Sequence, residues 1–206
     1  MAILYIETNF LMSIATGRDP DANNLLVSVP TSVSIAIPSI CCMESLSALE
    51  DEIKRRNRFL GEMEKQISQL KRDKTSPSAQ SLVFHLEQSL TENEALINDI
   101  NARLFAALDL LATKIEMISL TAGILQASLN SIFIEEDPTD NLILHCILNH
   151  AHLHPNEVKV FLSNNTKEFG LPKVRDALRE VGITKYFSRT EDFLGWLQSQ
   201  STNFRF

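Results

Sequence analysis

The stretch Ala2-Ile3-Leu4-Tyr5-Ile6-Glu7-Thr8-Asn9 decides the fold, because it places a short apolar run directly before an acidic, polar stop. Five residues rich in strand formers and bounded by polar residues predict a buried strand. The mostly apolar residues 10–15 that follow predict a helix. The chain therefore begins as strand, turn and helix, and the carboxylate of Glu7 stands at the end of the strand.

The same alternation of strand and helix continues along the chain. Further strands are predicted at residues 33–37, 115–118, 158–162 and 185–187. Further short helices are predicted at residues 23–29, 121–131, 138–150, 172–181 and 190–198. Repeated alternation of this kind predicts an α/β fold of three layers, with a central parallel sheet covered by helices on both faces.

Two long helical segments interrupt this alternation. In the first, apolar residues recur at spacings of three, four or seven, with Arg56 as the one polar interruption: Leu46, Leu49, Ile53, Leu60, Met63, Ile67 and Leu70. A turn at residues 74–78 separates it from a second segment that runs from Leu82 to Leu111. The pattern predicts a long antiparallel helical hairpin, inserted over residues 51–114 into a single domain of residues 1–206.

The charge of the chain is unevenly distributed. The 206 residues include 26 acidic and 19 basic ones, a net charge of −7, which argues against a surface that binds nucleic acid everywhere. Residues 51–74 carry eight bases and five acids, a net +3, so the remainder carries −10. This basic arm is a candidate RNA-binding surface through Lys54, Arg55, Arg58 and Lys65. A solvated coiled-coil face or a surface for a second copy or a protein partner explains the pattern equally well.

The cysteine content and hydropathy predict the compartment. Three cysteines, Cys41, Cys42 and Cys146, are too few for a disulfide framework and lack the spacing of a zinc site. No long apolar run predicts a signal peptide or a membrane span. We therefore expect a cytoplasmic protein that does not interact with membranes.

Carboxylates follow four of the predicted strands. Glu7 comes directly after the first strand and Glu44 lies early in the helix after the second, whereas Asp137 and Asp140 begin the helix after the third and Glu168 follows the fourth. Because ligands of parallel α/β sheets collect at the carboxyl ends of the strands, we expect these acids to converge. Clustered carboxylates favour a hard divalent cation, Mg²⁺ or Mn²⁺, and the chemistry typical of such a site is phosphodiester hydrolysis.

At these positions the chain resembles the PIN domain family of metal-dependent nucleases, which includes the VapC-type toxins. The resemblance rests on four motifs in order: residues 4–9, residues 37–39 with Glu44, residues 137–144, and residues 161–169. It implies that Glu7, Glu44 and Asp140 bind the metal and that Glu168 or Asn165 completes the catalytic site. Asn9 and Asp137 would support it, Asn9 by orienting an acid or by capping the first helix and Asp137 as the cap of the helix that carries Asp140.

The resemblance implies a metal-dependent endoribonuclease that acts on RNA. The family typically has aspartate where this chain has Glu7 and Glu168. A catalytically weakened binding module, whose hairpin recruits a protein or RNA partner, is therefore the alternative. A structural coiled-coil protein with an α/β scaffold is a third possibility.

Four histidines lie in or after the helix predicted over residues 138–150, namely His145, His150, His152 and His154. Alternate spacing does not place His150, His152 and His154 on one helical face. We expect a solvated helix end in which the imidazoles lie near the negative pole of the helix, and no metal site.

Overall fold

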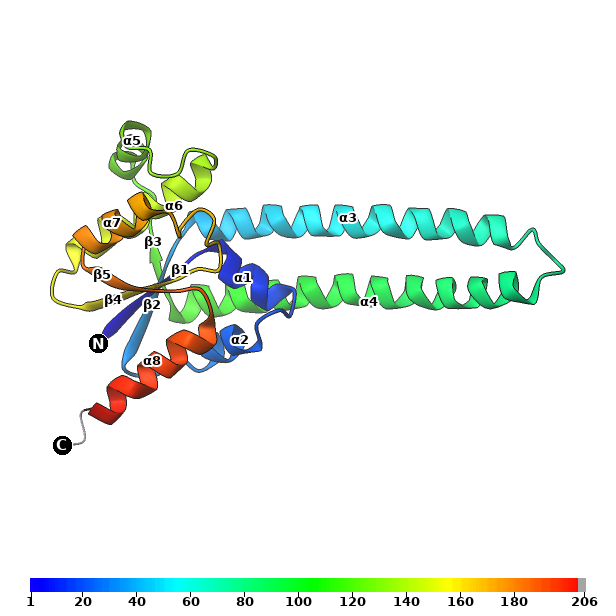
Figure 1. The fold of residues 1–206 in the computed structure, drawn as a ribbon, viewed down its shortest axis with the longest axis horizontal. Helices are drawn as coiled ribbons and strands as arrows, with labels where there is room; N and C mark the ends of the chain where they lie inside the picture. The colour runs from blue at the N-terminus through cyan, green and yellow to red at the C-terminus, as the bar shows by residue number, and fades with distance from the viewer. Residues whose placement is uncertain (204–206) are drawn as a thin grey trace.

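A parallel five-stranded sheet forms the centre of the protein, as a computed structural model describes it for residues 1–203, with side chains to residue 200 (Figure 1). Its strand order is β3-β2-β1-β4-β5. The strands are β1 (Ala2–Ile6), β2 (Val33–Pro38), β3 (Glu116–Ile118), β4 (Val158–Leu162) and β5 (Ile183–Phe187). All five strands predicted from the sequence are present, and every pairing is parallel as expected.

Helices cover both faces of the sheet, which confirms the three-layer α/β fold (Figure 1). One face carries α1 (Thr8–Ala15), α2 (Pro20–Val27), the end of α4 (Pro77–Lys114) and α8 (Thr190–Asn203). The other face carries α5 (Ala122–Asn130), α6 (Pro138–Leu153) and α7 (Pro172–Glu180). None of the helices described is long and apolar enough to span a membrane.

The order of the strands reverses at β1, which pairs with β2 on one side and with β4 on the other. β2 and then β3 extend the sheet from one edge of β1, and β4 and then β5 extend it from the opposite edge. Such a switch point leaves a crevice at the carboxyl ends of the two diverging strands. In the β1–β4 register, Ile6 pairs with Leu162, so the residues that follow, Glu7 and Ser163, leave the sheet together.

The predicted hairpin is formed by α3 (Ile40–Leu70) and α4, which run side by side away from the sheet (Figure 1). Along the arm the buried apolar contacts are few, with Met63, Ile67 and Ala79 in the seam between the helices. The last third of α4 lies instead in the core of the body, where its buried residues are Ile100, Leu104, Ala107 and Leu111. The segment that projects free of the body is therefore shorter than residues 51–114.

This division predicts different outcomes for two deletions. Replacing residues 60–90 by a short Gly-Ser linker should leave a folded domain, because the core residues of α4 remain. Deleting residues 51–114 removes three large core side chains, Ile100, Leu104 and Leu111. Each is worth about 2–5 kcal/mol, so their sum matches the whole stability of about 5–15 kcal/mol expected of a domain. Circular dichroism during urea denaturation measures both. Equal cooperative unfolding of the two proteins would show that the end of α4 is dispensable to the core.

Candidate functional site

Glu7 is a buried carboxylate at the point where β1 passes into α1. Its side chain is 1% exposed and caps α1, with Oε2 accepting the backbone N–H of Asn9 at 2.6 Å. The other oxygen, Oε1, has no hydrogen-bond partner among the residues described. The pKa of Glu7 is raised to about 8, mainly by burial and less by the charges of Asp140 and Glu44, against the lowering effect of the Asn9 N–H and the Ser163 hydroxyl. Asn9 thus orients the acid through its backbone, and Glu7 itself is the helix cap.

Glu44 reaches the site from the first turns of α3. Its Oε2 accepts a hydrogen bond from the hydroxyl of Thr8, the residue next to Glu7. The fold allows this contact because it brings α3 beside the start of α1. Partial burial raises the pKa of Glu44, the Thr8 bond lowers it, and the charge of Asp137 raises it.

Asp140 lies in the first turn of α6 and is 6% exposed. Asp137 caps this helix by accepting the backbone N–H groups of Thr139 and Asp140 at 2.9 and 3.0 Å, as the sequence predicted. The pKa of Asp140 is raised to about 7, mainly by burial and further by the charges of Asp137, Glu44 and Glu168, against the lowering effect of the Asn165 bond. The acids are therefore close enough to oppose one another's ionisation.

The two candidates for the fourth position both lie at Asp140. The amide Nδ2 of Asn165 donates a hydrogen bond to Asp140 Oδ2 at 2.8 Å. Glu168 is 8% exposed, its charge acts on Asp140, and its Oε1 lies 3.2 Å from the ammonium of Lys167. Ser163 accepts the backbone N–H of Asn165 at 3.1 Å and so shapes the turn after β4.

The residues present fit a hard divalent cation. The donors are carboxylate oxygens that burial and mutual repulsion make costly to ionise, and one of them, Glu7 Oε1, is buried without a partner. A cation of the Mg²⁺ or Mn²⁺ type relieves both costs, because it takes oxygen ligands and neutralises their charge. No basic side chain is paired with Glu7, Glu44 or Asp140 in the part of the chain described.

Beside the acids lies a cavity of about 370 Å³ that the sequence did not predict. Leu162, Ser163 and Asn164 of the turn after β4 line one side. The charged part of the lining is mixed, with Arg18 and Arg189 beside Asp19, Asp21 and Glu191, and Arg189 is paired with Glu191. Arg18 follows Gly17, whose φ of +68° turns the chain at the end of α1. Arg189 directly precedes α8, so two segments far apart in sequence bring these cations together, and no local pattern could have revealed them.

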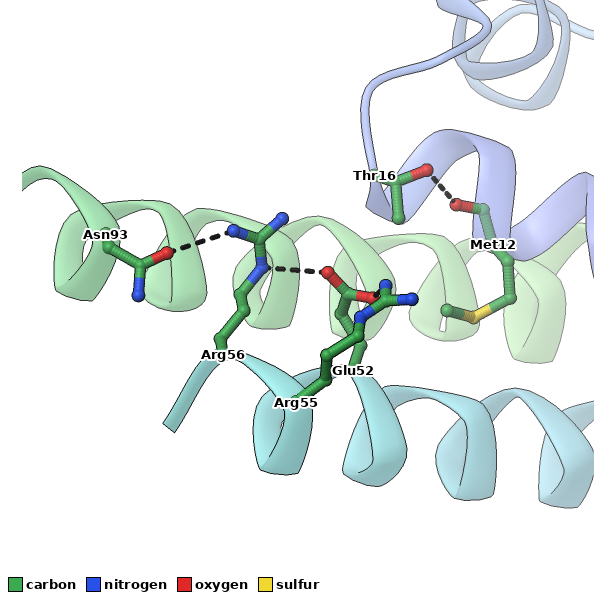
Figure 2. A network of polar contacts seen from close by, with 6 residues as sticks. All are labelled: Met12, Thr16, Glu52, Arg55, Arg56 and Asn93. Carbon is green, nitrogen blue, oxygen red and sulfur yellow. Dashed lines mark hydrogen bonds and ion pairs between the residues drawn. The ribbon is translucent and has the colours of Figure 1, made fainter. Parts of the chain in front are cut away.

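A second hollow continues from Arg18 towards the base of the arm. Arg55 and Arg58 of α3 line it together with Met12 and Thr16 of α1. Figure 2 shows Arg55 beside Glu52, with which it forms an ion pair. Among the residues described, Arg58 has no ion-pair or hydrogen-bond partner.

The network at the base of the arm explains the one polar position in the apolar seam. Arg56 donates through Nε to Glu52 at 2.8 Å and through Nη1 to Asn93 of α4 at 3.0 Å (Figure 2). Glu52 and Asn93 are both buried, 8% and 9% exposed. The network joins α3 to α4 at one place, which fixes their register.

The other two basic candidates lie outside these hollows. Lys54 pairs with Glu50 and Asp51, and Lys65 pairs with Glu62, all on the exposed surface of α3. Two phenylalanines of the arm, Phe59 and Phe84, are more than half exposed. A role of the arm in binding RNA, a partner or a second copy stays a prediction.

The expectation of a solvated helix end was wrong for His150, and His145, further back in the helix, is buried as well. His145 is 8% exposed, with Nε2 bonded to the carbonyl of Ser131 at 2.8 Å. His150 is also 8% exposed and is bonded to Tyr5 and Glu116. Both residues lie on the buried side of α6, where polar partners from the sheet and the preceding loop satisfy them. His152 is exposed, in agreement with the spacing argument.

The fold and the acids define a class of protein, a three-layer α/β domain with a carboxylate site at the switch point of its sheet. The chain belongs to the PIN domain family, whose model matches residues 4–169. This places it in a family of nucleases that generally depend on divalent metals.

Among solved structures, the chain is similar to VapBC2 from Rickettsia felis, which was crystallised bound to a DNA fragment from its promoter. The identity is 17% and the TM-score 0.39, and the match covers 84% of this chain and 95% of that one. No curated protein sequence matches the chain.

The raised pKa values predict how stability depends on pH in the absence of metal. In the unfolded chain Glu7 loses its proton near pH 4.5, whereas in the folded protein it keeps it to about pH 8, so stability falls as pH rises between these values. Glu7→Gln should therefore have a higher melting temperature than the wild type at pH 8 by a few degrees, and little difference at pH 4.5.

Differential scanning fluorimetry in EDTA measures this, with the exposed Glu180→Gln as a control that removes an acid elsewhere. Adding Mn²⁺ at pH 8 should stabilise the wild type more than Glu7→Gln. If the difference in melting temperature between the wild type and Glu7→Gln is the same at pH 4.5 and pH 8, Glu7 does not have the raised pKa.

Proposed function

We propose that this protein is a metal-dependent endoribonuclease that hydrolyses RNA phosphodiester bonds at the site formed by Glu7, Glu44 and Asp140. The observation that carries the proposal is the buried, unpartnered Oε1 of Glu7 within a cluster of acids that raise one another's pKa. Leaving such an oxygen without a partner costs stability, and a cation-binding role accounts for that cost. Membership of the PIN domain family supports the same conclusion.

Glu7, Glu44 and Asp140 would hold the Mg²⁺ or Mn²⁺ ion, with Asn165 or Glu168 completing the site. When bound, such a cation activates water as the nucleophile and stabilises charge on the phosphate and the leaving oxygen. Three hydrogen bonds fix the acids beforehand: Asn9 N–H to Glu7, the Thr8 hydroxyl to Glu44, and the Asn165 amide to Asp140. Preorganised ligands reduce the loss of freedom on binding.

Arg18 and Arg189 are placed to bind the phosphates of the substrate that flank the cleaved bond. They line the cavity that also contains Ser163 and Asn164, the residues between β4 and Asn165. Phosphate would have to compete there with the acids of the same lining, above all with Glu191, which is paired with Arg189. Arginine suits this role because its planar guanidinium binds phosphate oxygens in pairs. The acidic body then attracts the cation and the neighbouring arginines attract the RNA backbone.

The proposal is tested by cleavage of a labelled single-stranded RNA with Mn²⁺ or Mg²⁺, and with EDTA as the blank. Glu44→Gln and Asp140→Asn should each lower the rate at least about 100-fold, because each loses a charged ligand worth several kcal/mol in the transition state. Glu135→Gln, an exposed acid that is paired with Lys173 outside the site, should cleave at the wild-type rate.

The result also separates the alternative function. If the wild type binds RNA and Mn²⁺ but leaves RNA intact with both metals, the protein is a binding module of the PIN fold. If all three variants cleave as the wild type does, the acids are not the catalytic site.

We further propose that RNA reaches the site along the base of the arm. Arg18 lines both hollows, so it connects Arg55 and Arg58 of α3 with Arg189 at the cavity. Acids stand among these arginines, and Arg55 and Arg189 are paired with Glu52 and Glu191. The free guanidinium of Arg58 makes it the best probe, since Arg55 is engaged by Glu52.

Arg58→Gln should weaken RNA binding and reduce the slope of log K against log salt by about 0.7, the loss of one phosphate contact with a single strand. Lys71→Gln is the matched control, a basic residue at the far end of the same helix that is paired with Glu87. Fluorescence anisotropy at several salt concentrations, with catalytically inactive Glu44→Gln as background, gives both quantities. Equal effects of the two substitutions would indicate general attraction to the arm and no defined path.

A further inference from the structure

Three residues outside the acidic site bring metal-binding atoms together. Glu116, the first residue of β3, and His150 and His154, near the end of α6, each place one ligand atom within 4.8 Å of the other two. The carboxylate Oε1 of Glu116 lies 3.1 Å from Nε2 of His150, and the two imidazole rings stack with centroids 4.2 Å apart. Unlike the triplet considered from the sequence, the histidines are four residues apart and share one side of the helix.

In each ring Nδ1 is held by a protein oxygen, so an ion would be bound through Nε2, which in His150 now contacts Glu116 Oε1. Nδ1 of His154 lies 2.8 Å from the carbonyl oxygen of His150, which can only accept, so this nitrogen carries the proton. In the neutral ring Nε2 of His154 then has a free lone pair. Nδ1 of His150 is bonded to the hydroxyl of Tyr5 at 2.9 Å, a group that can donate or accept. Histidine ligands of metals are held in this way, with one nitrogen on the metal and the other on an oxygen.

We propose that Glu116, His150 and His154 form a second metal site that binds Zn²⁺ or a similar first-row transition ion. Two imidazole nitrogens and one carboxylate are a donor set typical of zinc, whereas the oxygen donors of the acidic site suit Mg²⁺ or Mn²⁺. Tetrahedral zinc places its ligand atoms about 3.3 Å apart, which the pair Glu116 and His150 already matches. Glu116 is about half exposed and His154 partly exposed, so both have room to close on the ion.

The site is separate from the acids although one helix serves both. Asp140 and His150 are ten residues apart in α6, about 15 Å along its axis. A bound ion would join β3, a three-residue strand at the edge of the sheet, to the end of α6. Its expected effect is therefore on stability, with one coordination position left open to water.

Isothermal titration of the tag-free protein with Zn²⁺, in excess Mg²⁺ to occupy oxygen-only sites, tests the proposal. The wild type should bind one Zn²⁺, and its melting temperature should rise by a few degrees. His154→Gln and Glu116→Gln should each weaken binding at least about tenfold and lose the thermal shift. Both side chains lie at the surface or partly so, so their loss leaves the core intact, unlike that of His150.

His152→Gln is the matched control, because it removes an exposed histidine of the same helix end. It should bind Zn²⁺ as the wild type does, and so should Glu44→Gln, which separates this site from the proposed nuclease centre. Co²⁺ in place of Zn²⁺ should give the intense visible absorption of a tetrahedral site in the wild type and not in His154→Gln. The proposal is overturned if the wild type binds no Zn²⁺, or if His154→Gln and His152→Gln bind it equally.

Discussion

The desolvation of the Glu7 carboxylate is the constraint on which the arrangement of the site depends. The side chain ends a fully buried strand in the middle of the sheet, where water cannot solvate its charge. The structure meets part of this cost with one backbone hydrogen bond and leaves the second oxygen unpaired. Every neighbouring acid increases the cost, as the raised pKa values of Glu7 and Asp140 indicate. The divalent cation proposed for this site would offset that cost.

The sequence was sufficient for the elements because their signals are local. The residues of β1 and β4, the Asp137 cap and the Pro77 turn each act within a few positions, so apolar runs and capping residues predicted them. The convergence of the acids was also predictable, because a parallel sheet gathers the carboxyl ends of its strands at one edge.

Contacts between distant segments were not predictable from these signals. The bond from Thr8 to Glu44 needs α1 beside α3. The cavity needs residues 18–21 and 188–191 to lie together, although they are far apart in the sequence. The length of the hairpin was predicted from its heptad spacing, but the periodicity is the same where α4 packs on the body and where it packs on α3. Only the fold shows that Ile100 and Leu111 belong to the core.

The histidines of α6 are a second case in which contacts between distant segments decide what a residue can bind. In the sequence, three alternate histidines resemble a polar helix end, because their spacing describes one helix without the strands that pack against it. The sheet adds Tyr5 and Glu116, which bury one imidazole and give it two polar partners. The two ends of α6 then differ in the ion that they suit: oxygen donors at the first turn favour a hard cation, and nitrogen donors at the last favour a softer one. The two proposed sites on this helix therefore differ in their donor atoms, and Mg²⁺ in excess would occupy the oxygen donors while Zn²⁺ binds the imidazoles.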